Sequence, residues 1–202
     1  MSDTYRTIAS PAESSLTEKR SKFLAYAYPV TTAAEALERV GELSRRYYDA
    51  RHVCYAYMLG ADRLTFRAND NGEPSGTAGR PILGQINSLE LTDVVVVVVR
   101  YFGGIKLGTP GLIAAYRQAA RQVLEEAAVV ERHVMRRVCL TYPYASINDA
   151  MKLTRLPGVH VVDTVYDNVC SLCIDVELDS LDRVLRAADD IDGASVQDNQ
   201  TT

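Results

Sequence analysis

No run of apolar residues in this 202-residue sequence approaches the about 20 residues that a helix needs to cross a bilayer. The longest run, Val94–Val99, has the length of a buried strand. The N-terminus lacks the basic start and the apolar stretch of a secretory signal peptide. We therefore expect a cytoplasmic protein with no part in a membrane.

Histidine is scarce, and the three that occur are His52, His133 and His160. No two of them have the H-x-x-x-H spacing of a metal-binding pair. The sequence also lacks the serine nucleophile elbow of hydrolases and the spacing of a P-loop, the loop that binds the phosphates of a nucleoside triphosphate. We therefore predict no catalytic residue, no metal and no cofactor. Acidic residues such as Asp70 and Glu73 could ligate a divalent cation, but in a polar loop they are usually solvated.

The sequence lacks a strong excess of either charge. It has 22 Lys and Arg against 26 Asp and Glu, a net charge of −4. Residues 1–134 hold 16 basic against 15 acidic side chains, whereas the remainder holds 6 against 11. Neither part is strongly basic, so no broad nucleic-acid surface is predicted and only a local basic patch stays open.

Cysteine is also rare, and we expect all four residues to be reduced and buried, as is typical of a cytoplasmic protein. They are Cys54, Cys139, Cys170 and Cys173. The last two have the C-x-x-C spacing that can indicate a metal or redox site. They lie in a segment that alternates like a strand, where residues three apart point to opposite faces. We interpret the pair as structural.

Residues 134–202 alternate between strand and helix patterns and form one predicted domain. A helix begins at a capping box on Ser146 and stops at Pro157, and the spacing of Leu181, Val184 and Ala188 predicts a second helix. The order is βαββαβ, which is that of a ferredoxin-like fold. The strands are predicted at 138–142, 159–167, 169–178 and 194–197, with frayed residues at 198–202.

Residues 1–133 form the other predicted domain, which is longer and less regular. Its helices are predicted after a capping box at Thr32, over 82–89, and from 109 to about 129. Because Val94–Val99 is continuously apolar, we expect that strand to be buried on both faces. Together the two domains predict an α+β protein. The other strands of this domain are predicted at 13–17, 21–29, 52–59 and 63–68.

Two glycine-rich loops, loop 1 (residues 69–79) and loop 2 (residues 101–108), each end at a predicted helix start. Unpaired backbone N–H groups and the helix dipole favour an anion there. In loop 1, Thr77 is the predicted helix cap. After loop 2, Thr109 is the predicted cap and Pro110 the first helical residue, which leaves the amides of Gly111 and Leu112 for a ligand. The alternative is that the glycines only form sharp turns.

The binding face that we predict from these loops combines cations, which supply positive charge, with glycines, which let a ligand approach the backbone. Aromatic residues nearby, such as Tyr101 and Phe102, could stack on bases or could fill a half-buried sheet face. Further possible site residues are His52, Asp70 and Glu73. The predicted binding residues are Gly76, Thr77, Gly79, Arg80, Arg100, Gly103, Gly104, Lys106, Gly108 and Arg117.

The sequences of both loops closely resemble the two signature segments of the YigZ/IMPACT family, and two shorter segments do so as well. The resemblance extends over nearly the whole chain, with the motifs in the family's order. The segments are Ser21–Ala25 (SKFLA), His52–Ala56 (HVCYA), Asp70–Leu83 (DNGEPSGTAGRPIL) and Val96–Gly108 (VVVVRYFGGIKLG).

This resemblance implies an N-terminal domain with the ribosomal protein S5 domain 2-like fold. It also implies a ferredoxin-like C-terminal domain similar to domains III and V of elongation factor G. Eukaryotic relatives regulate translation under amino-acid starvation and carry an additional RWD domain, which we do not expect in this chain. We therefore expect a more general role at the ribosome or on RNA.

Three residues depart from the family pattern. Asn71 stands where the family typically has a second Asp, which weakens the interpretation of loop 1 as a metal site. Pro110 and Ala114 stand where relatives usually have Gly and Arg. Pro110 is compatible with a helix start. Ala114 removes one cation from the expected anion site.

Three functional hypotheses follow. The first is a translation-associated regulatory protein that contacts RNA or a ribosome-associated protein through loops 1 and 2. The second is a hydrolase, since some relatives carry a proline-dipeptidase label. The third is a protein–protein adaptor, in which the acidic C-terminal domain docks a basic partner. The sequence does not indicate the oligomeric state.

Overall fold

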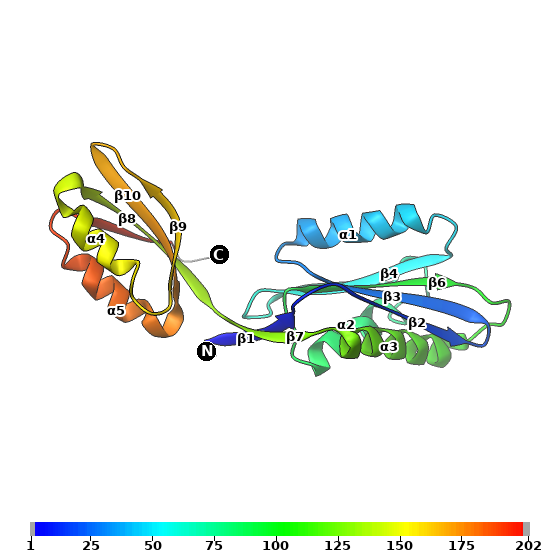
Figure 1. The fold of residues 1–202 in the computed structure, drawn as a ribbon. Coiled ribbons are helices and arrows are strands. Elements are labelled where there is room, and N and C mark those ends of the chain that lie inside the picture. The colour runs from blue at the N-terminus through cyan, green and yellow to red at the C-terminus, as the bar shows by residue number, and fades with distance from the viewer. Residues whose placement is uncertain (1–2, 200–202) are drawn as a thin grey trace. The chain divides into compact units, whose positions relative to one another are not determined.

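The computed structural model describes residues 3–199 and divides the chain into two compact units (Figure 1). One unit comprises residues 5–132, and the other comprises residues 133–199 together with residues 3–4. Both units combine helices with antiparallel sheet, so the chain is an α+β protein, as predicted. No helix of residues 3–199 is long and apolar enough to span a membrane.

The larger unit is built on a five-stranded antiparallel sheet with the strand order β2-β3-β6-β4-β5. Two strands that the sequence analysis missed, β1 and β7, pair in a separate two-stranded sheet. The elements are β1 (Thr4–Ile8), β2 (Ala12–Glu18), β3 (Ser21–Pro29), α1 (Ala33–Arg46), β4 (His52–Leu59), β5 (Thr65–Asn69), α2 (Gly79–Ser88), β6 (Val94–Tyr101), α3 (Gly108–Glu126) and β7 (Val129–His133).

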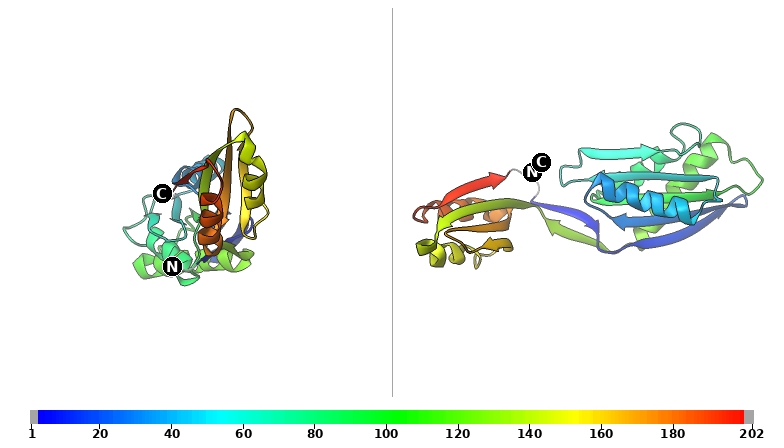
Figure 2. Two further views of the ribbon diagram at one scale, coloured as in Figure 1. Left: turned by 90° about the vertical axis from the view of Figure 1, so that its left-hand side faces the viewer. Right: turned by 90° about the horizontal axis from the view of Figure 1, so that it is seen from above.

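Helices cover both faces of the five-stranded sheet (Figures 1 and 2). Helix α1 lies on one face, and α2 and α3 lie on the other. The valines of β6 divide between the two cores: Val94, Val96 and Val98 pack with the α2 and α3 side, whereas the alternate valines pack with α1. This confirms the prediction that the strand is buried on both faces.

Helix α1 begins at the predicted capping box. The Thr32 hydroxyl accepts a hydrogen bond from the Glu35 N–H at 3.2 Å. The Glu35 carboxylate accepts in return from the Thr31 N–H at 2.8 Å, one residue earlier than in the standard box. These bonds satisfy orphan donors at the helix start, and the backbone N–H bonds to Glu35 lower the pKa of its carboxyl.

The smaller unit has the predicted βαββαβ order. Its strands follow the order β11-β8-β10-β9, and both helices pack on one face of the sheet over a single apolar core. The elements are β8 (Met135–Pro143), a 3₁₀ turn (Tyr144–Ser146), α4 (Ile147–Leu153), β9 (Val159–Val165), β10 (Val169–Glu177), α5 (Leu178–Asp189) and β11 (Ser195–Asn199).

Two details of this unit differ from the predictions. Ser146 makes no capping hydrogen bond, because its hydroxyl donates instead to the Asp192 carbonyl at 2.8 Å. Asp198 and Asn199 are not frayed, since they belong to β11 and pair with Val138 and Arg137 of β8. The rest of the segment that was predicted to fray, residues 200–202, lies outside the described residues.

The prediction for the cysteines was partly wrong. Cys170 and Cys173 point to opposite faces of β10, as predicted: Cys170 is buried in the core. On the other face, Cys173 lies directly opposite Cys139 of β8 and forms a disulfide with it. Cys139 and Cys173 are separated by 34 positions and are brought together by strand register, which the spacing of cysteines along the chain does not reveal.

The disulfide closes a loop across the sheet of the smaller unit, so we expect it to restrict the unfolded chain. Protein purified in air should show two free thiols after denaturation without reductant, those of Cys54 and Cys170. Its free energy of unfolding should exceed that of the Cys139→Ser/Cys173→Ser variant by about 2–4 kcal/mol. Thiol counting by alkylation and mass spectrometry, with urea unfolding, measures both. Four free thiols would contradict the pairing.

Candidate functional site

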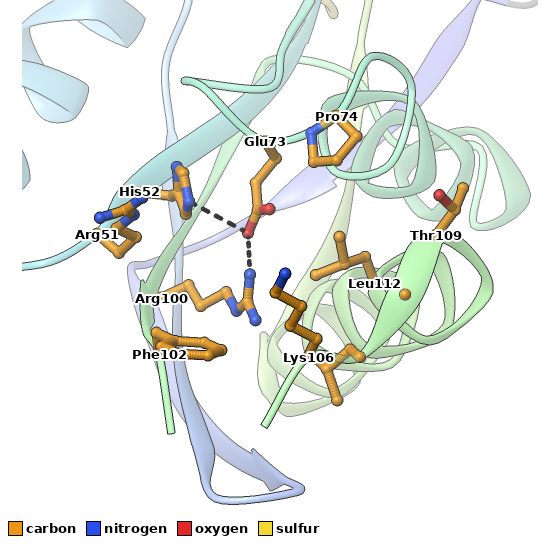
Figure 3. A pocket seen from close by; sticks show the side chains of 11 residues that line it. Arg51, His52, Glu73, Pro74, Arg100, Phe102, Lys106, Thr109 and Leu112 are labelled. Carbon is orange, nitrogen blue, oxygen red and sulfur yellow. Dashed lines mark hydrogen bonds and ion pairs between the residues drawn. The ribbon is translucent and has the colours of Figure 1, made fainter. Parts of the chain in front are cut away.

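Loops 1 and 2 enclose a cavity of about 450 Å³ in the larger unit, which we call the loop pocket (Figure 3). The antiparallel register of β4 and β6 sets it up, because this register places His52 directly opposite Arg100 where loop 2 begins. The lining residues are Arg51, His52, Glu73, Pro74, Arg100, Phe102, Lys106, Leu107, Gly108, Thr109 and Leu112.

A buried ion pair joins loop 1 to the sheet at the floor of the loop pocket. The Arg100 guanidinium donates to Glu73 Oε1 at 2.6 Å, and the two residues are only 5% and 8% exposed. The guanidinium also stands over the rings of Phe23 and Phe102, 5.6 and 5.8 Å from their centroids. Arg100 is therefore not the free cation that the sequence analysis predicted, because Glu73 neutralises it.

Two further side chains surround Glu73 Oε1. The Tyr116 hydroxyl donates to it at 2.9 Å, and His52 Nε2 lies 3.8 Å away. The other ring nitrogen of His52, Nδ1, is 2.8 Å from the carbonyl oxygen of Asn71. The side chain of Asn71 accepts the Val53 N–H at 2.9 Å, which ties loop 1 to β4. No hydrogen bond of the described residues uses the second oxygen, Glu73 Oε2.

The buried thiol beneath this cluster is not a nucleophile at neutral pH. Cys54 Sγ lies 3.3 Å from the Tyr116 hydroxyl oxygen and 3.0 Å from the Asp70 carbonyl oxygen. Burial raises the pKa of Cys54 to about 12, and burial also raises the pKa of Tyr116. Both groups therefore stay protonated, and neither supplies the thiolate or phenolate that covalent catalysis would need.

Loop 1 already holds an anion at the start of α2, and that anion is Asp70. Its carboxylate accepts hydrogen bonds from the N–H groups of Gly76, Ala78 and Gly79 at 2.8, 3.0 and 2.8 Å. The prediction that loop 1 offers these amides to a ligand was therefore wrong, and Asp70 is not free to ligate a cation. The predicted cap was also wrong: Ala78 is the N-cap, and the Thr77 hydroxyl donates to the Pro74 carbonyl.

Loop 2 ends earlier than predicted. Helix α3 begins at Gly108, with Leu107 as its N-cap, so Thr109 and Pro110 are helical residues. Because the first backbone N–H groups of a helix lack intrahelical partners, the open amides are those of Gly108 and Thr109 rather than those of Gly111 and Leu112. Gly108 and Thr109 line the loop pocket, so the correction brings the helix start into it.

Two of the predicted glycines are explained by the protein's own backbone. A Cβ on Gly103 would lie 2.0 Å from the Arg20 carbonyl carbon, and a Cβ on Gly79 would lie 2.5 Å from the Asn69 nitrogen. Only glycine fits such close approaches. Gly104 differs, since it has a φ of +84° and a Cβ added there would meet no heavy atom within 4 Å.

The predicted site residues do not all meet in one place. Among them, the loop pocket is lined by His52, Glu73, Arg100, Lys106 and Gly108. Arg80 and Arg117 are exposed on α2 and α3 but do not line it, and neither do Gly76, Thr77, Gly79, Gly103 and Gly104.

Arg51 is a site residue that was not predicted from the sequence. It precedes β4 and carries no motif, but its N–H donates to the Arg100 carbonyl at 3.0 Å, which places it at the pocket. Phe102 was noted only as a possible stacking residue. Its ring is 50% exposed and forms part of the lining. Arg51 could have been found by predicting the register of the two strands, because the pairing of residue 52 with residue 100 places residue 51 beside the pocket.

Comparisons with known proteins place the pocket within a recognised domain. The family model of the Impact N-terminal domain matches residues 19–124, a range that includes every residue lining the loop pocket. IMPACT family member YvyE of Bacillus subtilis is 40% identical over 136 residues, which cover 67% of this chain and 63% of that protein. IMPACT family member YigZ of Escherichia coli is 38% identical over 110 residues, or 54% of each chain.

The match to these relatives is thus partial: this chain spans between half and two thirds of their length. A solved structure described as "Crystal structure of an hypothetical protein" matches with a TM-score of 0.79 and 25% identity. That match covers 100% of both chains.

The Asp70 cap generates a pH-dependent prediction. Burial alone would raise the pKa of Asp70, but the N–H bonds from Gly76, Gly79 and Ala78 outweigh it, so the pKa is lowered. The stabilisation is therefore fully present above the ordinary pKa of Asp and is lost as the pH falls through the lowered folded pKa. At pH 7, Asp70→Asn should reduce the free energy of unfolding by about 1–2 kcal/mol, because an NH₂ group replaces one of the carboxylate oxygens that accept these N–H bonds.

Urea unfolding of wild type and Asp70→Asn across the acid range measures this difference, which should shrink once the pH falls below the ordinary Asp value. Asp62→Asn is the matched control, because Asp62 accepts the Leu64 N–H within an exposed turn and caps no helix of residues 3–199. A penalty for Asp70→Asn that is independent of pH would contradict the charged cap.

Proposed function

This chain belongs to the IMPACT family, and we propose that it is a cytoplasmic, translation-associated regulatory protein that contacts RNA through the loop pocket and its rim. The link to translation rests on the family resemblance, since eukaryotic relatives regulate translation. The contact with RNA rests on the chemistry of the pocket. A ribosome-associated protein is the other partner that the sequence suggested.

The observation that carries the proposal is the excess of positive charge in a pocket that also presents an aromatic ring. Three cationic side chains, those of Arg51, Arg100 and Lys106, line it against one carboxylate, that of Glu73. Cations of this kind bind backbone phosphates, and a half-exposed ring such as that of Phe102 stacks on bases. These two kinds of contact together are typical of single-stranded nucleic-acid binding.

Hydrolysis is the less favoured alternative. The Glu73 carboxylate is already engaged by Arg100 and Tyr116, and the Cys54 thiol is held protonated, so neither is an activated nucleophile. Within residues 3–199, no group of three His, Cys, Asp or Glu side chains is placed to hold a metal ion. The adaptor hypothesis concerns the smaller unit and does not use the loop pocket.

We expect binding of a short single-stranded RNA to weaken steeply with salt. Because each phosphate contact contributes about 0.7 to the slope of log affinity against log salt, Lys106→Ala/Arg51→Ala should flatten the slope by about 1.4. Fluorescence anisotropy with labelled RNA at several salt concentrations measures the slope. The matched control, Lys22→Ala/Arg45→Ala, removes two exposed cations that do not line the loop pocket and should leave the slope unchanged.

Salt-insensitive binding, or equal loss of affinity in the control, would argue against phosphate contacts at the loop pocket. Sedimentation of cell lysate at low salt then tests the link to translation. Wild type should travel with ribosomal fractions and Lys106→Ala/Arg51→Ala should stay at the top of the gradient. Wild type remaining at the top would count against ribosome association.

A further inference from the structure

The charge of the loop pocket matches a phosphate monoester better than the phosphodiesters inside a nucleic-acid strand. The lining holds three cationic side chains, those of Arg51, Arg100 and Lys106, against the one carboxylate of Glu73, which is an excess of two formal positive charges. A phosphate monoester carries about −1.5 to −2 at pH 7, whereas an internal phosphodiester carries one charge. The same positive charge would repel a ligand ammonium group, such as that of an amino acid or a peptide N-terminus.

Lys106 is the cation on the loop 2 side of the pocket, whereas Arg51 lies beside His52 (Figure 3). Arg100 is engaged by Glu73, whereas no ion pair of the described residues involves Lys106, whose amine points into the cavity in Figure 3. The first residues of α3, Gly108 and Thr109, line the same side with their open amides. A phosphate bound there would contact Lys106 and this helix start together.

The remaining lining fits a nucleoside attached to such a phosphate. The half-exposed ring of Phe102 offers an apolar face to a base, and Leu107 and Leu112 add apolar surface. At the floor, Glu73 is only 8% exposed, and its Oε2 is unused by the hydrogen bonds of the described residues. Oε2 is not one of the fully buried polar atoms of residues 3–199 that lack a partner, so a ligand can reach it. An accessible carboxylate oxygen accepts from an N–H or O–H donor, and both bases and ribose supply one.

We infer that the loop pocket binds a nucleoside monophosphate unit, with the phosphate at Lys106 and the start of α3, the base on Phe102 and a nucleoside donor on Glu73 Oε2. The unit is either the phosphorylated end of an RNA strand or a free nucleotide, and its RNA form rests on the proposed function. A cavity of about 450 Å³ lies within the size range of small-ligand sites, which suits one nucleotide rather than a continuous strand.

The test compares ligands that differ only in the terminal phosphate. AMP and adenosine are titrated into ¹⁵N-labelled protein at constant ionic strength, and matched RNA oligonucleotides with a 5′-phosphate, a 3′-phosphate or neither are titrated by anisotropy. A hydrogen bond to a charged group contributes enough for AMP to bind about tenfold or more tightly than adenosine. Shifted amide signals should include those of Gly108 and Thr109.

Two variants separate the roles within the pocket. Lys106→Ala should weaken AMP about tenfold and leave adenosine nearly unchanged, because only the phosphate contacts Lys106. Phe102→Ala should weaken both ligands by a similar factor, because both carry the base. Both positions are exposed, so the variants should fold like wild type. Lys22→Ala is the charge-matched control and should bind both ligands as wild type does.

The outcomes distinguish this inference from the proposed function. RNA that binds equally well with and without a terminal phosphate, together with AMP no tighter than adenosine, would overturn the inference and leave RNA binding intact. Tight AMP binding with no RNA binding would support the pocket as a free-nucleotide site and overturn the proposed function. Preference for one phosphorylated RNA end would support both.

Discussion

The ion pair between Glu73 and Arg100 is the interaction on which the loop pocket depends. Arg100 continues a strand whose six preceding valines are all buried, so its charge enters the protein at the end of an apolar core. A buried charge without a partner is strongly unfavourable. Glu73 supplies that partner from loop 1, and the need to keep the charge paired therefore holds loop 1 against the end of β6.

The rest of the pocket follows from this attachment. Loop 1 is fixed at one end by Asp70, which caps α2, and in its middle by Glu73 and Asn71, which bond to β6 and β4. Loop 2 is held by the Gly103 N–H, which donates to the Ser21 hydroxyl at 3.2 Å, and the lack of a side chain lets Gly103 approach the backbone at Arg20. Because both walls are tied down by their own hydrogen bonds, the cavity is largely formed before a ligand arrives, which lowers the entropic cost of binding.

Much of the fold could be predicted because its signals are local. The apolar run Val94–Val99 and the alternating patterns of the smaller unit specify strands. Thr32 marks a helix start through a hydrogen bond to Glu35, only three residues further along the chain. The missed features are those that strand register creates. Cys139 meets Cys173, and Arg51 reaches the pocket, only because distant strands align.

The site was predicted less well than the fold for the same reason. Glycines and cations in loops 1 and 2 indicate an anion site, but they do not reveal which charges the protein already neutralises. Asp70 accepts the hydrogen bonds of the loop 1 amides, and Glu73 forms an ion pair with Arg100. Two of the predicted binding elements are therefore already used in contacts within the protein. Lys106 and the start of α3 are the parts of the predicted site that stay open to a ligand.

A double-mutant cycle on Glu73 and Arg100 tests this dependence most directly. Urea unfolding is measured for Glu73→Gln, Arg100→Met and the double variant. Each single variant leaves a buried group without its partner and should lose about 3–5 kcal/mol of unfolding free energy. The double variant should lose less than the sum by about 1–3 kcal/mol. Additive losses would show that the two residues act independently and would contradict the account of how the pocket is held.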